Sequence, residues 1–133
     1  NGHFLVAEAH DLPFDNDSFD RSTCFSVFQH LADLNQVKKV LNEFIRIIKP
    51  TGFILIGDIL YPQKETTVRP NNKSKTKKWW HSTLNHDLTK LHIDEEFFNT
   101  YCQENDYACK ILDQNIPGRN LPGPRYDVVI NLK

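Results

Sequence analysis

The sequence predicts an α/β fold organised around a mostly parallel sheet, and three observations support this. Apolar residues recur at three- and four-residue spacing from Val37 to Ile48, which is typical of an amphipathic helix packed on a sheet. Residues Phe53–Ile56 are all apolar, which is typical of a parallel strand covered on both faces. Apolar side chains alternate along Tyr126–Leu132, as in a strand with one buried face.

The first half of the chain reads as strand, strand, helix and strand. A short apolar strand is expected at Phe4–Ala7, and a second from about Arg21. Asp33 followed by Gln36 resembles a capping box and predicts the start of the helix. Pro50 predicts its end, because the residue before a proline is pushed out of helical geometry. A right-handed crossover should then lead into the next strand.

The second half begins with an irregular segment, 62–91, which predicts a loop and one or two short helices. Asp94 is the expected N-cap of a later helix, which should end with Asn105 or Asp106 in a left-handed conformation. A strand at Tyr107–Leu112 would then pair with the closing strand. The side chains expected on the buried face of the helix are Phe97, Phe98, Tyr101 and Cys102.

The length and composition are those of a globular chain with one domain at most. The chain has 133 residues, of which 39% are apolar and 25% charged, and it has no apolar run near the length of a membrane span. Its three cysteines are scattered, which argues against a disulfide framework and for a reducing compartment. A cytoplasmic location is therefore expected.

The net charge of −1 is unevenly distributed. Residues 62–80 carry a net charge of +5, so the rest of the chain carries −6. Such a basic segment is most often a solvated loop, although it is also compatible with an anionic substrate or nucleic acid.

Two motif strings carry a family resemblance. The first runs through Glu8-Ala9, Leu12-Pro13-Phe14 and Asp15–Asp20 to a strand that ends near His30. The second, Glu43–Gly52, reads EFIRIIKPTG. Together they resemble the class I S-adenosylmethionine-dependent methyltransferases, most closely the small-molecule group often called type 11.

The resemblance implies a Rossmann-like methyltransferase fold with a mostly parallel sheet and an antiparallel last strand. Residues 1–133 would be the carboxyl-terminal part of one methyltransferase domain, with 62–91 as a variable cover over the substrate. The family's glycine-rich cofactor loop lies upstream of anything present in this sequence. We therefore expect a missing amino-terminal segment, or a second chain, to complete the sheet beside Phe4–Ala7.

The family's cofactor is S-adenosylmethionine, and the resemblance places two groups of residues around it. The first would border the adenine, with Leu12 against the ring face, and the second would flank the sugar and the methionine. The alternatives are an acid that caps a loop and a Cys and Phe that belong to the core. The first group is Glu8, Ala9, His10 and Leu12, and the second is Cys24, Phe25 and Ser26.

A hydroxyl acceptor would also need a general base. The candidates for this role are His30, His81 and His86, although a His packed near a helix start is an equally good interpretation of His30. The spacing of the histidines matches no zinc motif, so no metal is expected. The candidates for contact with the acceptor are Asp58, Tyr61, Trp79, Trp80 and Arg119, with loop capping, lid anchoring and surface ion pairs as alternatives. Arg125 has two interpretations that the sequence leaves undecided, a side chain that binds an anion or a surface ion-pair partner.

The function that follows is methyl transfer to a small-molecule acceptor as part of a larger domain. The alternative is a catalytically inactive binding or scaffold domain, which the missing glycine-rich loop favours. A nucleic-acid binder that uses the basic segment with Trp79 and Trp80 is a further alternative, which the low overall charge disfavours.

Overall fold

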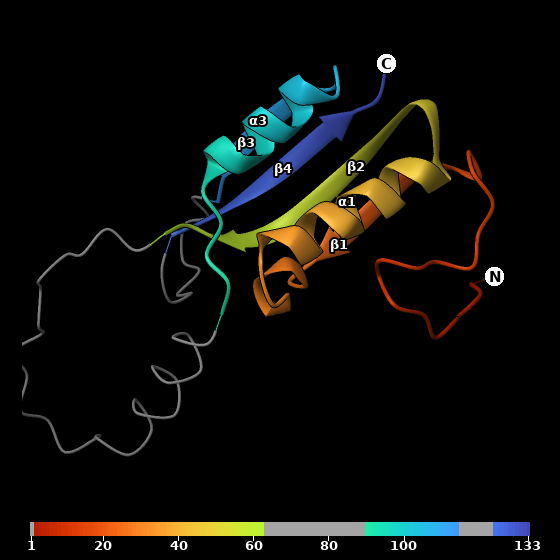
Figure 1. The fold of residues 1–133 in the computed structure, drawn as a ribbon, viewed down its shortest axis with the longest axis horizontal. Coiled ribbons are helices and arrows are strands. Elements are labelled where there is room, and N and C mark those ends of the chain that lie inside the picture. Colours follow the sequence, from red (N-terminus) through yellow and green to blue (C-terminus); the bar gives the residue numbers. More distant parts are fainter. Residues whose placement is uncertain (1, 63–89, 115–123) are drawn as a thin grey trace, which may run out of the picture.

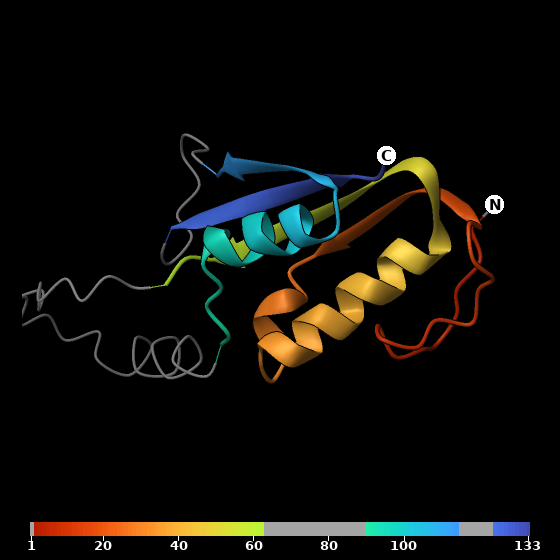
Figure 2. The ribbon, with the colours of Figure 1, turned by 45° about the horizontal axis from the view of Figure 1, so that its top comes forward.

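The computed structural model describes residues 2–62, 90–114 and 124–133, which form a four-stranded sheet in the order β1-β2-β4-β3 (Figure 1). Helices α1 and α3 both lie on one face of this sheet (Figure 2). The elements are β1 (Phe19–Phe25), the 3-10 turn η1 (Phe28–His30), α1 (Leu34–Ile47), β2 (Ile48–Leu60), α3 (Glu95–Glu104), β3 (Ala108–Asp113) and β4 (Arg125–Asn131).

The β1–α1–β2 unit confirms the predicted strand, helix and parallel strand. β1 pairs with β2 in parallel, with Cys24 opposite Ile56. Asp33 caps α1, and its side chain accepts the Gln36 N–H at 2.9 Å. The Gln36 side chain accepts the N–H of Ala32 at 2.7 Å, one residue before the N-cap, so the capping box is displaced by one residue from its usual form.

α1 ends at Ile47, ahead of Pro50 as predicted, but β2 starts earlier than expected. Ile48 already has an extended backbone, with φ −91° and ψ 133°, and it pairs with Phe19 of β1. The pairing is irregular before Phe53, where the regular register begins. Helix and strand are thus joined directly, without a separate loop.

The two faces of β2 differ in burial. Ile54 and Ile56 are fully buried beneath the helices, whereas Phe53 and Leu55 on the other face are half-buried. The prediction of a strand covered on both faces is therefore wrong for the part of the chain that the structure describes. The reason is that α1 and α3 lie on the same face of the sheet (Figure 2).

Phe4–Ala7 does not form the predicted strand. Phe4 is 97% exposed and Val6 is fully exposed, and this segment has an extended path with no pairing among the described strands. A strand forms only when its backbone groups find partners in a neighbouring strand. The prediction of a strand is therefore wrong for the described residues.

The carboxyl-terminal elements follow the predictions closely. Asp94 caps α3 and accepts the Glu96 N–H at 3.0 Å. The helix ends at Glu104 with Asn105 as its C-cap, and Asp106 follows with φ 59°, so an Asp takes the left-handed position. β4 is antiparallel to both β2 and β3, which confirms the antiparallel last strand.

The core lies between the helices and the sheet. Phe98 of α3 packs against Phe28 and Tyr126, with ring centroids 6.3 Å and 6.2 Å away. Tyr126 is fully buried, and its hydroxyl donates to the Ile93 carbonyl at 2.7 Å. Among the described residues, no helix has the length and apolar character that a membrane crossing requires.

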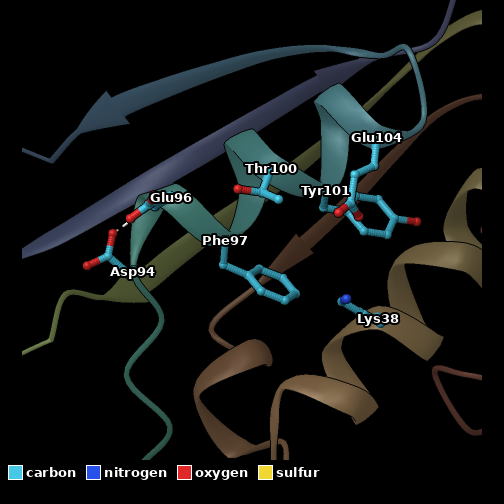
Figure 3. Close-up of a pocket in the computed structure, with 7 residues that line it drawn as sticks. All are labelled: Lys38, Asp94, Glu96, Phe97, Thr100, Tyr101 and Glu104. Atoms are coloured by element: carbon cyan, nitrogen blue, oxygen red, sulfur yellow. Dashed lines mark hydrogen bonds between the residues drawn. The ribbon is translucent and has the colours of Figure 1, made fainter.

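Phe97, predicted to be buried, is half-buried. Its ring lines a groove of about 280 Å³ between α3 and α1, in which Lys38 of α1 lies across from Phe97, Tyr101 and Glu104 of α3 (Figure 3). The groove contains none of the predicted cofactor or acceptor residues, so the candidate site has to be sought elsewhere.

Candidate functional site

The carboxyl ends of β1 and β2 carry two residues in left-handed conformations. Ser26, directly after β1, has φ 59°, and Asp58 near the end of β2 has φ 67°. A non-glycine residue in this conformation costs about 1–3 kcal/mol and persists only where its surroundings hold it. Such residues cluster at ligand and active sites, so this edge of the sheet is the candidate site.

Hydrogen bonds hold the two strained residues together. The backbone N–H of Ser26 donates to the Gly57 carbonyl at 3.0 Å, and its hydroxyl donates to the Asp58 carboxylate. The N–H of Asp58 donates to Oδ1 of Asp127 on β4 at 2.9 Å. Contacts from β1, β2 and β4 therefore fix the backbone geometry of Ser26 and Asp58.

Gly57 allows the Phe25 ring to lie against the sheet. A Cβ atom added at Gly57 would lie 2.7 Å from Cε2 of Phe25, closer than carbon atoms pack. The Phe25 ring is nevertheless 54% exposed. It therefore offers an apolar surface beside the polar groups of Ser26 and Asp58, the combination that small-molecule sites use to hold a flat ligand.

A buried ion pair lies behind this surface. Nη1 of Arg125 lies 2.9 Å from Oδ1 of Asp58, and the two side chains are only 5% and 9% exposed. The same Nη1 donates to Oε1 of Gln29 at 3.2 Å, and Nε2 of Gln29 donates to the Ser26 carbonyl at 3.4 Å. The sequence and the family resemblance proposed Ser26 for cofactor contact and Asp58 for acceptor contact, left Arg125 open and did not single out Gln29.

Cys24 lies on the inner side of β1. It is 8% exposed and belongs to the core cluster, and burial raises the pKa of its thiol to about 11. The thiol is therefore protonated at neutral pH and is a poor nucleophile. This position agrees with the interpretation of Cys24 as a core residue.

The other predicted cofactor residues lie in a loop that is fastened to α1. The Leu12 N–H donates to Oε1 of Glu43 at 2.7 Å, and Arg46 donates to the Leu12 carbonyl at 3.1 Å. The hydrogen bonds from Arg46 lower the pKa of Glu43 to about 2. Glu8 and His10 are exposed, while Ala9 and Leu12 are half-buried against the core.

The structure does not bring this loop and the Ser26–Asp58 edge together. Glu43 and Arg46 lie in the last turns of α1, and α1 runs back from the end of β1 toward its beginning (Figure 1). The loop therefore lies beside the far half of α1, whereas Phe25 and Ser26 lie at the opposite end of β1 (Figure 1).

The remaining candidates are only partly described. The Tyr61 hydroxyl donates to Oδ1 of Asp113 at 2.6 Å, and burial together with this carboxylate raises the pKa of Tyr61. His30 is exposed at the end of η1, with its Nε2 3.5 Å from Nε2 of Gln29. Nearly all of the cover segment lies outside the described residues. The candidates that lie outside them are His81, His86, Trp79, Trp80 and Arg119.

Metal ligands are not grouped in residues 2–62, 90–114 and 124–133, where no three His, Cys, Asp or Glu side chains are arranged to hold an ion. The edge presents a half-buried hydroxyl and an exposed aromatic ring, with a carboxylate and a guanidinium buried behind them as an ion pair. These groups suit the binding and orientation of a small organic ligand.

Comparisons with known proteins find sequence matches in the amino-terminal part. Residues 1–56 match the family described as a methyltransferase domain. The tRNA (carboxymethyluridine(34)-5-O)-methyltransferase of Arabidopsis thaliana is 36% identical over 64 residues, which are 48% of this chain and 16% of that protein. The demethylmenaquinone methyltransferase of Clavibacter sepedonicus is 41% identical over 59 residues, 44% of this chain and 23% of that protein. The matched part thus spans less than a quarter of either curated relative.

Solved structures extend the likeness to almost the whole chain. A SAM-dependent methyltransferase of Methanosarcina mazei superposes with a TM-score of 0.65 at 15% identity, covering 98% of this chain and 66% of that one. At this identity the match shows the fold. The resemblance seen in the sequence is confirmed, and the chain has part of the class I S-adenosylmethionine-dependent methyltransferase fold.

Proposed function

We propose that this chain is the acceptor-side part of a domain that transfers a methyl group from S-adenosylmethionine to a small molecule. The observation that carries the proposal is the strained, hydrogen-bonded pair Ser26 and Asp58 at the carboxyl ends of two parallel strands. In open α/β sheets this edge is where ligands bind. A small-molecule acceptor is supported by a relative named for the methylation of demethylmenaquinone.

The residues present fit a part of the cofactor. Phe25 provides an exposed apolar wall, and Ser26 provides a hydroxyl group beside it. The half-buried Ala9 and Leu12 provide a second apolar wall, and Glu8 and His10 add exposed polar groups beside it. We propose that the two groups contact opposite ends of the same elongated ligand, which accounts for their separation along α1.

When bound, the cofactor supplies a methyl group that its positive sulfur already activates. The protein's part is therefore to align the acceptor with that group and to exclude water. With a hydroxyl acceptor, a proton must also leave. His30 is the described candidate for accepting it, because it is exposed beside the network that contains Gln29. His81 and His86 remain candidates for the same role.

The acceptor would lie against the end of β2 and the cover segment. Tyr61 follows β2 directly, and Trp79, Trp80 and Arg119 are proposed to contribute from the segments beyond it. Asp58 is a poor candidate for direct contact, because both of its carboxylate oxygens already face Arg125 and Ser26. We therefore assign Asp58 to shaping the site.

The partner proposed for this chain is the other part of the methyltransferase domain, as an amino-terminal segment or as a second chain. β1 lies at the edge of the described sheet, and Phe4, Leu5 and Val6 are exposed. A further strand beside β1 would satisfy its backbone groups and cover apolar surface.

A tRNA acceptor is the second candidate. The relative from Arabidopsis thaliana is named for methylation of a tRNA nucleoside. The net charge of +5 in residues 62–80 suits a phosphate backbone, while the overall charge of −1 does not.

Calorimetry with S-adenosylhomocysteine tests the proposal. The protein is compared alone and after fusion to the amino-terminal part of the Clavibacter relative, with adenosine as a control ligand. We expect micromolar affinity in the fusion and no measurable binding by the chain alone. Tight binding by the chain alone would contradict the need for a partner, and no binding by the folded fusion would contradict the proposed function. Labelled methyl transfer to a naphthol acceptor and to tRNA then separates the two candidates.

A further inference from the structure

Arg125 is the first residue of β4, which lies on the side of β2 remote from β1. Its backbone pairs with Leu60, beyond the end of the parallel β1–β2 ladder. Its guanidinium nevertheless reaches back to Asp58, with Nη1 2.9 Å from Oδ1. We infer that Arg125 is a positioning residue of the methyl-transfer site, which acts through Asp58 on Ser26; this inference rests on the proposed function.

The contacts close into a ring of four side chains and one carbonyl. Arg125 contacts Asp58, whose other oxygen accepts the Ser26 hydroxyl. Gln29 joins the remaining two members, since it accepts from Arg125 and donates to the Ser26 carbonyl. The ring thus connects the ends of β1 and β2, the turn η1 and the start of β4. Arg125 reaches Ser26 by two routes, one through Asp58 and one through Gln29.

Stability alone does not explain this ring. Removing an arginine and a carboxylate from water costs several kcal/mol per ion in general, and well-packed apolar side chains often do as well or better. The arrangement also leaves Nε of Arg125 buried without a hydrogen-bond partner in the described part of the chain, and Oδ1 of Asp58 has only the ion pair. A buried network of this kind is better explained by the geometry that it imposes.

That geometry is the left-handed backbone of Ser26 and Asp58. Both residues have φ values near 60°, at 59° and 67°, which the unaided chain disfavours. A hydrogen bond from the Ser26 hydroxyl to the Asp58 carboxylate joins the two side chains, and the ion pair with Arg125 fixes the other oxygen of that carboxylate. Without Arg125, Asp58 would be a buried acid with no counter-ion and would turn toward water, taking the Ser26 hydroxyl with it.

The test uses the fusion protein described above and four variants. Arg125→Gln removes the charge, Arg125→Lys retains it, Asp58→Asn removes the carboxylate, and Lys110→Gln removes an exposed charge from the neighbouring strand β3 as a control. The measurements are the affinity for S-adenosylhomocysteine, kcat and KM for methyl transfer, and the urea midpoint. Gln29→Ala removes the hydrogen bonds of Gln29 to Arg125 and to the Ser26 carbonyl but keeps the Arg125–Asp58 ion pair. It replaces Arg125→Gln if that variant unfolds.

We expect Arg125→Gln to weaken S-adenosylhomocysteine binding roughly ten-fold and to lower kcat, with partial rescue in Arg125→Lys. Adding Arg125→Gln to Asp58→Asn should cost no more than Asp58→Asn alone, because the two residues act in one chain of contacts. Unchanged affinity in folded Arg125→Gln, or fully additive losses, would overturn the positioning role. Absence of binding in the unmodified fusion would instead overturn the proposed function itself.

Discussion

Arg46 is the residue that fastens the predicted adenine loop to the fold, and its replacement gives the sharpest stability test. Its guanidinium makes five hydrogen bonds, two to the carboxylate of Glu43 and three to the loop. Those to the carbonyls of Phe14 and Leu12 measure 2.7 Å and 3.1 Å. No other described side chain holds the loop to α1 through so many contacts.

The size of the effect follows from these contacts. A hydrogen bond to a charged group contributes about 1.5–3 kcal/mol when well buried. Arg46 is one-third exposed and its bonds form one cluster, so they do not add. We expect Arg46→Gln to lower the free energy of unfolding by about 2–3 kcal/mol.

The pH dependence gives an independent check. Arg46 lowers the pKa of Glu43 from its usual 4.5 to about 2. Because the folded-state value lies below the unfolded-state value, this stabilisation is complete above about pH 4.5 and is lost as the pH falls toward 2. The full shift corresponds to about 3 kcal/mol, which solvent screening of a partly exposed pair reduces to about 1–2 kcal/mol.

Urea denaturation followed by far-ultraviolet circular dichroism, at neutral pH and near pH 3, measures both effects. Lys49→Gln is the matched control, because it removes an exposed ion pair with Asp20 and should change stability by less than about 0.5 kcal/mol. Arg46→Gln should also flatten the loss of stability between the two pH values. A variant as stable as the control, with an unchanged pH dependence, would refute the role of Arg46.

Two further substitutions test the local geometry by urea denaturation. Gly57→Ala should cost about 1–3 kcal/mol because the new methyl group overlaps the Phe25 ring, and the cost should shrink in a Phe25→Ala background. An equal cost in both backgrounds would show that the ring is not the obstacle. Asp106→Gly should raise stability by about 0.5–1 kcal/mol, because Asp106 has φ 59° after the end of α3 and glycine adopts this conformation without strain. An Asp106→Gly protein no more stable than Asp106→Ala would count against this reasoning.

The helices could be predicted because their signals are local. The spacing of apolar residues from Val37 to Ile48, the caps Asp33 and Asp94, and the left-handed Asp106 all depend on neighbours within a few residues. The strand at Phe4–Ala7 could not be judged in this way. Its composition suits a strand, but a strand needs a partner, and the described part of the chain supplies none.

The candidate site shows the same division. Ser26 and Asp58 lie at the ends of predicted strands, so the edge of the sheet could be located from the sequence and the family resemblance. Gln29 could not, because its role depends on an arginine that lies distant in sequence and returns to this edge only through the antiparallel pairing of β4. An Arg directly before one predicted strand and an Asp at the end of another are the sequence signal that could have suggested the pair.

The central claim is that S-adenosylmethionine binds at the edge formed by the ends of β1 and β2. A crystal structure of the fusion protein with S-adenosylhomocysteine measures this most directly. We predict that the adenine lies against Glu8, Ala9 and Leu12, and that the remainder of the ligand reaches Phe25 and Ser26. A ligand that contacts neither Phe25 nor Ser26 would contradict the claim.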